Sequence, residues 1–121
     1  MNLLKLSCYI YMRVHLIKKQ TIEDYCQEQP RSKSSFEHWV SILQLSDWSI
    51  PADIMKTYAS ADLLGNGSNR VVFNIGGNHY RMICKYAFGA KMIHLFVCWI
   101  GTHAEYDKVC AKNEQYSINY Y

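Results

Sequence analysis

A histidine and a tyrosine lie close together near the end of the chain, in the segment Thr102-His103-Ala104-Glu105-Tyr106-Asp107. The imidazole of His103 can take up or release a proton near neutral pH, and the phenol of Tyr106 can exchange a hydrogen bond or stack on a base. These groups suit acid–base chemistry at a phosphodiester. The alternative is structural: Thr102 can cap a helix that starts at His103, and Tyr106 can cover a core.

Two basic residues, Arg81 and Lys85, precede that segment in a stretch where apolar and polar residues alternate. The alternation predicts a β-strand, in which side chains four residues apart share a face and lie roughly 13 Å from each other. That separation suits contacts with two phosphates along an extended RNA strand. The two side chains would then form a track for the RNA backbone rather than a single pocket. The alternative role for Arg81 is an ion pair with Asp107.

The chemistry that these residues favour is RNA cleavage without a metal ion. The ribose 2′-hydroxyl is a nucleophile that RNA itself carries, so the protein has only to move protons and stabilise the phosphorane with cations. The sequence shows no group of carboxylates and histidines with the spacing of metal ligands. We therefore expect neither a metal nor a cofactor.

The basic residues are distributed unevenly along the chain. The formal net charge is only +3, but the stretch between Asp62 and Glu105 holds no acidic residue. Its basic residues are Arg70, Arg81, Lys85 and Lys91. We expect an anionic partner to meet this half of the molecule. A buried sheet is an equally good explanation, because it excludes carboxylates and tolerates a few cations with apolar stems.

Cysteine usage and the N-terminus indicate a cytoplasmic protein. The five cysteines are widely spaced without a CxxC pair, which is typical of a reducing compartment, and Cys84 and Cys98 lie in apolar runs that predict core positions. Residues 1–11 are apolar, but too short to span a bilayer and without a signal-peptide cleavage pattern. We expect residues 1–11 to be either a loose N-terminal extension or an artefact of an upstream start site, and residues 12–121 to form a single domain.

The first half of the chain predicts a strand followed by helices. Residues 13–17 alternate like a short strand, and Thr21 can cap a helix with Glu23 and Asp24 in its first turn and an end before Pro30. Ser34 or Ser35 can cap a second helix, in which apolar residues between 36 and 43 recur at helical spacing. Residues 48–69 predict mostly loop and short turn.

The second half predicts three strands and a terminal helix. Residues 70–75 alternate, Gly76-Gly77-Asn78 forms a hairpin turn, and the even residues from 80 to 88 make one apolar face opposite His79, Arg81 and Lys85. Residues 92–100 are apolar on both faces, which predicts a covered strand. A turn and the start of a helix follow at 101–107. The fold class is therefore α+β.

Two of these segments carry a family resemblance. The runs Arg70 to Arg81 and Trp99 to Val109, with the upstream Pro51-Ala52-Asp53 and Ser60-Ala61-Asp62, closely resemble the HigB family of toxin–antitoxin systems, over about residues 12 to 110. HigB proteins are similar to the RelE/ParE superfamily. The resemblance implies a compact RelE-like fold: a short N-terminal strand, two helices packed on an antiparallel sheet, and a short C-terminal helix.

The resemblance also implies an activity and partners. Members of the family are endoribonucleases that cleave mRNA, commonly on the ribosome, and thereby inhibit translation. A co-encoded helix-turn-helix antitoxin similar to HigA neutralises them, and they meet operator DNA only through the antitoxin complex. No membrane partner is implied. The same superfamily includes toxins that inhibit a protein target such as gyrase, and a role as co-repressor is a further alternative, because fold does not fix function.

Site roles carry over by position. Arg81 resembles the arginine expected at the scissile phosphate, and His103 and Tyr106 resemble residues that handle protons or stack a base. Asn78 is a further RNA-contact candidate, and the charge pattern adds Arg70, Lys85 and Lys91. Many family members carry basic residues where this chain has Gly76 and Cys98. We expect these two losses to weaken phosphate stabilisation unless Lys85 or Lys91 substitutes.

Overall fold

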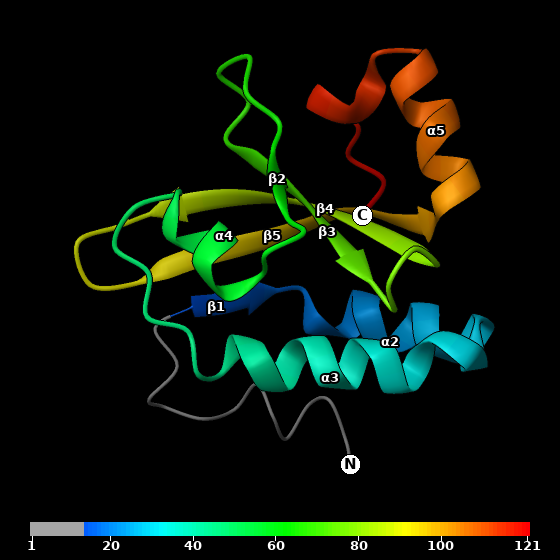
Figure 1. Ribbon diagram of the computed structural model, residues 1–121, viewed down its shortest axis with the longest axis horizontal. Helices are drawn as coiled ribbons and strands as arrows, with labels where there is room; N and C mark the ends of the chain where they lie inside the picture. The colour runs from blue at the N-terminus through cyan, green and yellow to red at the C-terminus, as the bar shows by residue number, and fades with distance from the viewer. Residues whose placement is uncertain (1–13) are drawn as a thin grey trace.

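The computed structural model describes residues 14–121, and its elements are arranged as a sheet with helices on both faces (Figure 1). The predictions for residues 1–11 and for Arg13 lie outside the described residues. The strands are β1 (Val14–Ile17), β2 (Asp62–Leu63), β3 (Arg70–Ile75), β4 (Tyr80–Phe88) and β5 (Ile93–Thr102). The helices are α2 (Lys19–Glu28), α3 (Lys33–Leu43), α4 (Asp53–Thr57) and α5 (His103–Ala111), with 3-10 turns at Pro30–Ser32 and Glu114–Tyr116. The predicted α+β class is confirmed.

The sheet has the order β1-β5-β4-β3-β2 and is mixed. Strands β2 to β5 pair antiparallel, as expected, whereas β1 pairs parallel with β5. A parallel pair requires a crossover, and the chain crosses through α2 and α3 on one face of the sheet. The predicted antiparallel sheet is therefore found in β2 to β5, and β1 adds a parallel edge strand to it.

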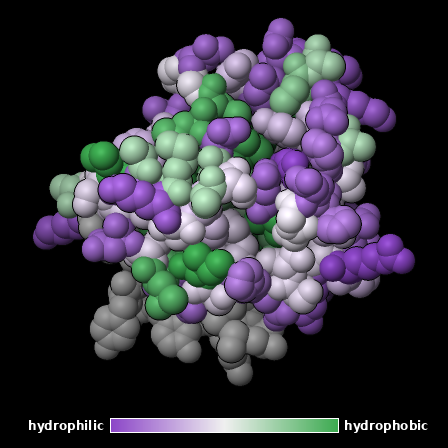
Figure 2. All heavy atoms as spheres, viewed as in Figure 1, coloured by the Kyte–Doolittle hydropathy of each residue, from purple (hydrophilic) through white to green (hydrophobic). Residues whose placement is uncertain are grey.

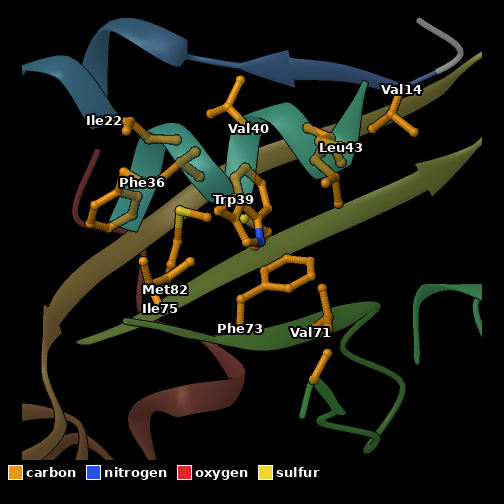
Figure 3. Packing of buried hydrophobic residues seen from close by; sticks show 14 of the residues in the cluster. Val14, Ile22, Phe36, Trp39, Val40, Leu43, Val71, Phe73, Ile75 and Met82 are labelled. Atoms are coloured by element: carbon orange, nitrogen blue, oxygen red, sulfur yellow. The ribbon is translucent and has the colours of Figure 1, made fainter. Parts of the chain in front are cut away.

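The main core lies between the sheet and helices α2 and α3 (Figure 3). Helix α3 buries Phe36, Trp39, Val40 and Leu43, which recur at the predicted helical spacing. The predicted apolar face of β4 is also confirmed, because its even residues from Tyr80 to Phe88 all belong to this cluster or pack against it. The opposite face of β4 is thereby left to Arg81, Ile83 and Lys85.

A second, smaller core covers part of that opposite face. It contains Val72, Ile83, Cys98 and Trp99 from the sheet and Val109 from α5, with Tyr106 and Ile118 packed against it. The predicted burial of Cys84 and Cys98 is confirmed. Helix α5 and the chain end therefore act as a cover on the face that carries Arg81 and Lys85.

A β-bulge in β5 explains why this strand is apolar on both faces. Trp99 pairs with Ile83 and Val97 pairs with Cys84, so Cys98 stands between them without a partner in the register. As a result Cys98 and Trp99 both lie in the second core, while Val97 and Ile100 belong to the main core.

Both predicted helix starts are wrong. Helix α2 begins at Lys19, so Thr21 lies within it as a buried residue, and Glu23 and Asp24 fall beyond its first turn. Helix α3 begins at Lys33, before Ser34 and Ser35, because the 3-10 turn that starts at Pro30 runs directly into it. The predicted end of the first helix before Pro30 is confirmed.

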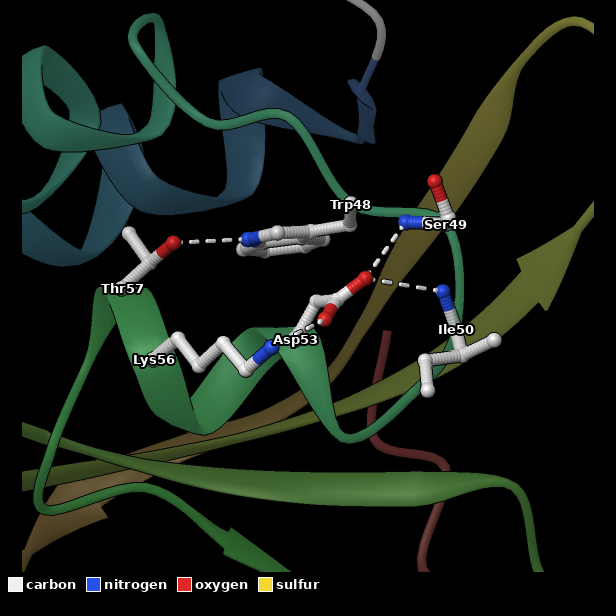
Figure 4. Close-up of polar contacts among 6 residues, drawn as sticks. All are labelled: Trp48, Ser49, Ile50, Asp53, Lys56 and Thr57. Atoms are coloured by element: carbon white, nitrogen blue, oxygen red, sulfur yellow. Dashed lines mark hydrogen bonds and ion pairs between the residues drawn. The ribbon is translucent and has the colours of Figure 1, made fainter.

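The segment predicted as loop contains β2 and α4, and Figure 4 shows the surroundings of α4 from close by. The Asp53 carboxylate accepts hydrogen bonds from the backbone N–H groups of Ser49 and Ile50 at 2.8 and 3.1 Å, which lower its pKa. The buried Trp48 donates from Nε1 to Thr57 Oγ1 at 2.8 Å. The resembling triplet Pro51-Ala52-Asp53 thus fixes the start of α4, an arrangement like half of a capping box.

Several large apolar side chains of the described residues are exposed. On the face seen in Figure 2, hydrophobic side chains form several separate spots among polar ones. The large exposed apolar residues include Leu45, Ile50 and Met55, which lie at the end of α3 and around α4. Within residues 14–121, no helix combines the length and the hydrophobicity that a membrane crossing requires.

Candidate functional site

A capping box fixes the start of α5. The Thr102 hydroxyl accepts a hydrogen bond from the N–H of Glu105 at 3.2 Å, and the Glu105 carboxylate accepts one from the N–H of Thr102 at 2.8 Å. The predicted capping role of Thr102 is confirmed. The backbone N–H of His103 also donates to the carbonyl oxygen of His79 at 3.0 Å, which ties α5 to the β3–β4 hairpin.

His103 is presented to solvent by this arrangement. Its side chain is 51% exposed, and its Nδ1 lies 3.8 Å from Oδ1 of Asp107, one helical turn later. Asp107 therefore pairs with His103 and not with Arg81. A carboxylate at this distance can orient the imidazole.

Tyr106 lies half-buried one turn into α5. Its ring centroid is 6.1 Å from that of Trp99 with an interplanar angle of 44°. Burial raises the pKa of Tyr106, and a hydrogen bond with Cys110 and the charge of Asp62 act in the same direction, whereas Arg81 opposes them. The phenol consequently stays protonated at neutral pH, and Arg81 and Asp62 are near enough to act on it.

Arg81 is a nearly buried cation on the same face of the sheet. It is 7% exposed, and its guanidinium donates to the Tyr80 carbonyl oxygen at 3.1 Å and to Asn78 Oδ1 at 3.4 Å. It lies opposite Gly101 of β5 in the sheet register. The structure thus brings Arg81, Asn78, His103 and Tyr106 to one end of the sheet, where β5 leads into α5.

Trp99 and Gly101 are site-shaping residues that the sequence patterns did not single out for a role. A Cβ atom at Gly101 would lie 2.5 Å from the six-membered ring of Trp99, so only glycine fits beneath the indole. The same indole supports the ring of Tyr106. A tryptophan two residues before a strand glycine was the available signal, since a glycine within a strand often marks a close approach.

Lys85 lies on the same face as Arg81, as predicted, but the expected open track between them is absent. Ile83 stands between the two on that face and is completely buried in the second core, under Val109. The prediction of one continuous track is therefore wrong, because α5 and the chain end cross the face at this point.

Arg70 has a structural contact that the charge pattern did not predict. It pairs with Lys85 in the sheet register and is 7% exposed. Its Nη1 donates to the carbonyl oxygens of Ile118 at 2.6 Å and Gln115 at 3.4 Å. Arg70 therefore holds the chain end against the sheet. Lys91 lies exposed in the β4–β5 turn.

Arg70 and Lys85 also line a groove of about 660 Å³ that Lys18 and the chain end share. Lys18 was not predicted as a site residue. It precedes α2 and reaches this position through the parallel pairing of β1 with β5, which no local pattern indicates.

Comparison with known proteins identifies the family. A family model described as HigB_toxin, a RelE-like toxic component of a toxin–antitoxin system, matches residues 32–109, which is more than half of the chain. An mRNA interferase HigB of Escherichia coli O6:H1 is 27% identical over 96 residues, covering 79% of this chain and 91% of that protein. An mRNA interferase toxin HigB of Escherichia coli K12 is 23% identical over 94 residues, covering 78% of this chain and 88% of that protein. Because the matched span includes all of the residues assembled at the end of the sheet, the resemblance is confirmed, and the chain belongs to the HigB toxin family.

Proposed function

We propose that this protein is an endoribonuclease toxin that cleaves mRNA and so inhibits translation. The observation that carries the proposal is the location of a nearly buried guanidinium, Arg81, and an exposed imidazole, His103, at the same end of the sheet. Cation and proton acceptor are the two groups that metal-independent RNA cleavage requires. The naming of similar proteins as mRNA interferases supports the same activity.

The proposed reaction is an internal transesterification. The 2′-oxygen of the nucleotide attacks the adjacent phosphorus, and the bond from phosphorus to the 5′-oxygen of the next nucleotide breaks. His103 accepts the 2′-hydroxyl proton, and Asp107 stabilises the resulting imidazolium. The leaving 5′-oxygen takes its proton from solvent, which reaches the exposed first turn of α5. The products are a 2′,3′-cyclic phosphate and a 5′-hydroxyl end.

Arg81 stabilises the charge that gathers on the phosphorane. Its low exposure strengthens this effect, because a cation surrounded by protein is screened less than one in water. Asn78 acts as its positioning residue through the hydrogen bond at 3.4 Å. Many family members carry a lysine at the position of Gly76, in the turn before Asn78. In this chain the stabilisation of the phosphorane charge therefore depends on Arg81.

Tyr106 contacts the RNA as a stacking surface. Its raised pKa makes the phenol a weak acid with no phenolate at neutral pH to accept a proton, and its ring already rests on Trp99. A base that stacks on Tyr106 would be held beside the first turn of α5, near His103. We assign proton exchange to His103 and base positioning to Tyr106.

The ribosome is the proposed setting for cleavage, in the cytoplasm. A protein with a net charge of only +3 binds free RNA weakly at cellular salt concentration, and it profits from a partner that orders the substrate. A HigA-like helix-turn-helix antitoxin is the proposed inhibitor, and operator DNA is reached only through the complex with it. Comparing cleavage of a message on translating ribosomes with cleavage of the same message alone tests the ribosome step.

The experiment that tests the activity uses purified protein and a reporter mRNA in a translating extract. Cleavage is expected for the parent protein and for the control variant Lys33→Ala, whose side chain is exposed on α3. Arg81→Ala and His103→Ala are each expected to lower the cleavage rate by about a hundredfold. Cleavage by both variants at the parental rate would contradict the assigned roles.

A further inference from the structure

The groove beside Lys85 is separate from the end of the sheet that holds Arg81. Its floor is formed by β4 and β5, and its walls come from the chain end on one side and from the junction of β1 and α2 on the other. The second core, which contains the buried Ile83, lies between this groove and the end of the sheet that holds Arg81. A ligand in the groove therefore does not occupy the proposed cleavage site.

The charge of the groove favours an anion. Lys18, Arg70 and Lys85 line it, and none of the described side chains that line it is acidic. Lys18 and Lys85 are exposed, and within residues 14–121 no carboxylate lies within ion-pair distance of either one. Helix α2 starts at this wall, and the positive end of its dipole adds to the same potential.

The groove also offers an aromatic surface and polar walls. Phe96 lines it and is 39% exposed, and its ring stacks on His94 with centroids 6.1 Å apart and an interplanar angle of 24°. Ser117 and Asn119 of the chain end add hydrogen-bonding groups. A cationic groove with an exposed aromatic ring is the arrangement by which proteins hold single-stranded nucleic acid without reading its sequence.

We propose that this groove binds a segment of single-stranded RNA remote from the bond that is cut, with Lys18 and Lys85 contacting phosphates and Phe96 stacking on a base. A volume of about 660 Å³ lies in the range of sites that hold ligands of nucleotide size. The inference rests on the proposed function, because that function supplies RNA as the ligand. In this proposal Arg70 has a mainly structural role. Its hydrogen bond to the carbonyl oxygen of Ile118 holds the chain end in place as one wall of the groove.

Binding can be measured apart from cleavage with a 2′-O-methyl RNA oligonucleotide of about 12 nucleotides, a length within the reach of such grooves, followed by fluorescence anisotropy. This probe has no 2′-hydroxyl nucleophile. The double variant Lys18→Ala/Lys85→Ala is expected to weaken binding about tenfold and to lower the slope of log affinity against log salt by about 1.4, at about 0.7 per phosphate contact. Phe96→Ala is expected to weaken binding about tenfold without changing that slope.

The matched control is Arg31→Ala/Lys33→Ala, which removes the same charge from exposed positions at the start of α3, in the helical layer on the other face. Its affinity is expected to stay within about twofold of the parent protein. Equal weakening by both double variants, or no weakening by the groove variant, would overturn the proposal. Groove-dependent binding in a protein that cleaves no message would instead refute the proposed function and leave the groove assignment in place.

Discussion

The indole of Trp99 fills the space that a side chain at Gly101 would require, with a Cβ atom only 2.5 Å from its ring carbons. Gly101 also stands opposite Arg81 in the sheet. Glycine at this position therefore leaves room for the indole, which packs against the ring of Tyr106 with centroids 6.1 Å apart.

Gly101→Ala should destabilise the protein by about 1–3 kcal/mol, the usual cost of forcing an extra methyl group into a packed site. Urea unfolding monitored by tryptophan fluorescence measures this loss. Adding Trp99→Phe removes part of the clashing ring, so the double variant should be less destabilised than the sum of the two single changes. Additive losses would show that the two residues do not compete for space.

Thr102→Ala should destabilise the protein by about 1 kcal/mol, because it removes the side-chain half of the capping box that starts α5. Cleavage should also slow, since His103 sits in the turn that the cap holds. Thr102→Ser keeps the hydroxyl and should behave like the parent protein in both assays. A Thr102→Ala protein with unchanged stability would mean that the cap contributes nothing to the fold.

Tyr106→Phe should keep most of the cleavage rate, whereas Tyr106→Ala should lose the stacking surface, a loss worth about 1–3 kcal/mol of binding per base. The reason is that burial already keeps the phenol of Tyr106 protonated by raising its pKa. The ratio of parent to Tyr106→Phe rates should therefore stay constant from neutral pH to about pH 9, below the ordinary tyrosine pKa of about 10. Equal losses in the two variants would assign proton transfer to the phenol.

Stability should fall as pH rises above about 10. Burial, aided by the charge of Glu105, raises the pKa of Tyr25 to about 12 in the folded protein, where its ring packs edge-on against Phe36 and Tyr80. The unfolded chain releases this proton near pH 10, so the stabilisation is complete below pH 10 and is lost as pH rises towards 12. Urea midpoints at pH 9 and 11 measure the effect.

Tyr25→Phe should reduce that alkaline loss, because the variant has no proton to release. Tyr120→Phe, at a position that is 75% exposed, is the matched control and should lose stability as the parent does. An unchanged alkaline loss in Tyr25→Phe would show that other groups cause it, among them the half-buried Tyr58 and the buried Cys84, whose pKa values are raised as well.

The long antiparallel strands were predictable because each follows a local pattern. Residues 70–75 and 80–88 alternate with a period of two around a glycine pair, and the structure places strands and a hairpin there. The start of α5 was equally local, since Thr102 and Glu105 form a capping box three residues apart. For the same reason His103 and Tyr106 could be placed near the end of the sheet before the fold was known.

The remaining features depend on contacts between distant segments, which no local pattern reports. The bulge at Cys98 shifts the faces of β5 and lets the chain end cover Ile83, which interrupts the expected track. The charge pattern predicts an RNA contact for Arg70 and does not predict its hydrogen bond to the carbonyl oxygen of Ile118, 48 residues away. Lys18 joins the groove only through the pairing of β1 with β5.

The central claim is tested most directly by the ends of the RNA that this protein cuts in a translating extract. Internal transesterification predicts 2′,3′-cyclic phosphate and 5′-hydroxyl ends, formed by the parent protein and lost in Arg81→Ala and His103→Ala. Ends bearing a 3′-hydroxyl and a 5′-phosphate would show attack by water and contradict the mechanism. Arrest of growth by the parent protein with its messages intact would contradict the ribonuclease assignment itself and point to a protein target.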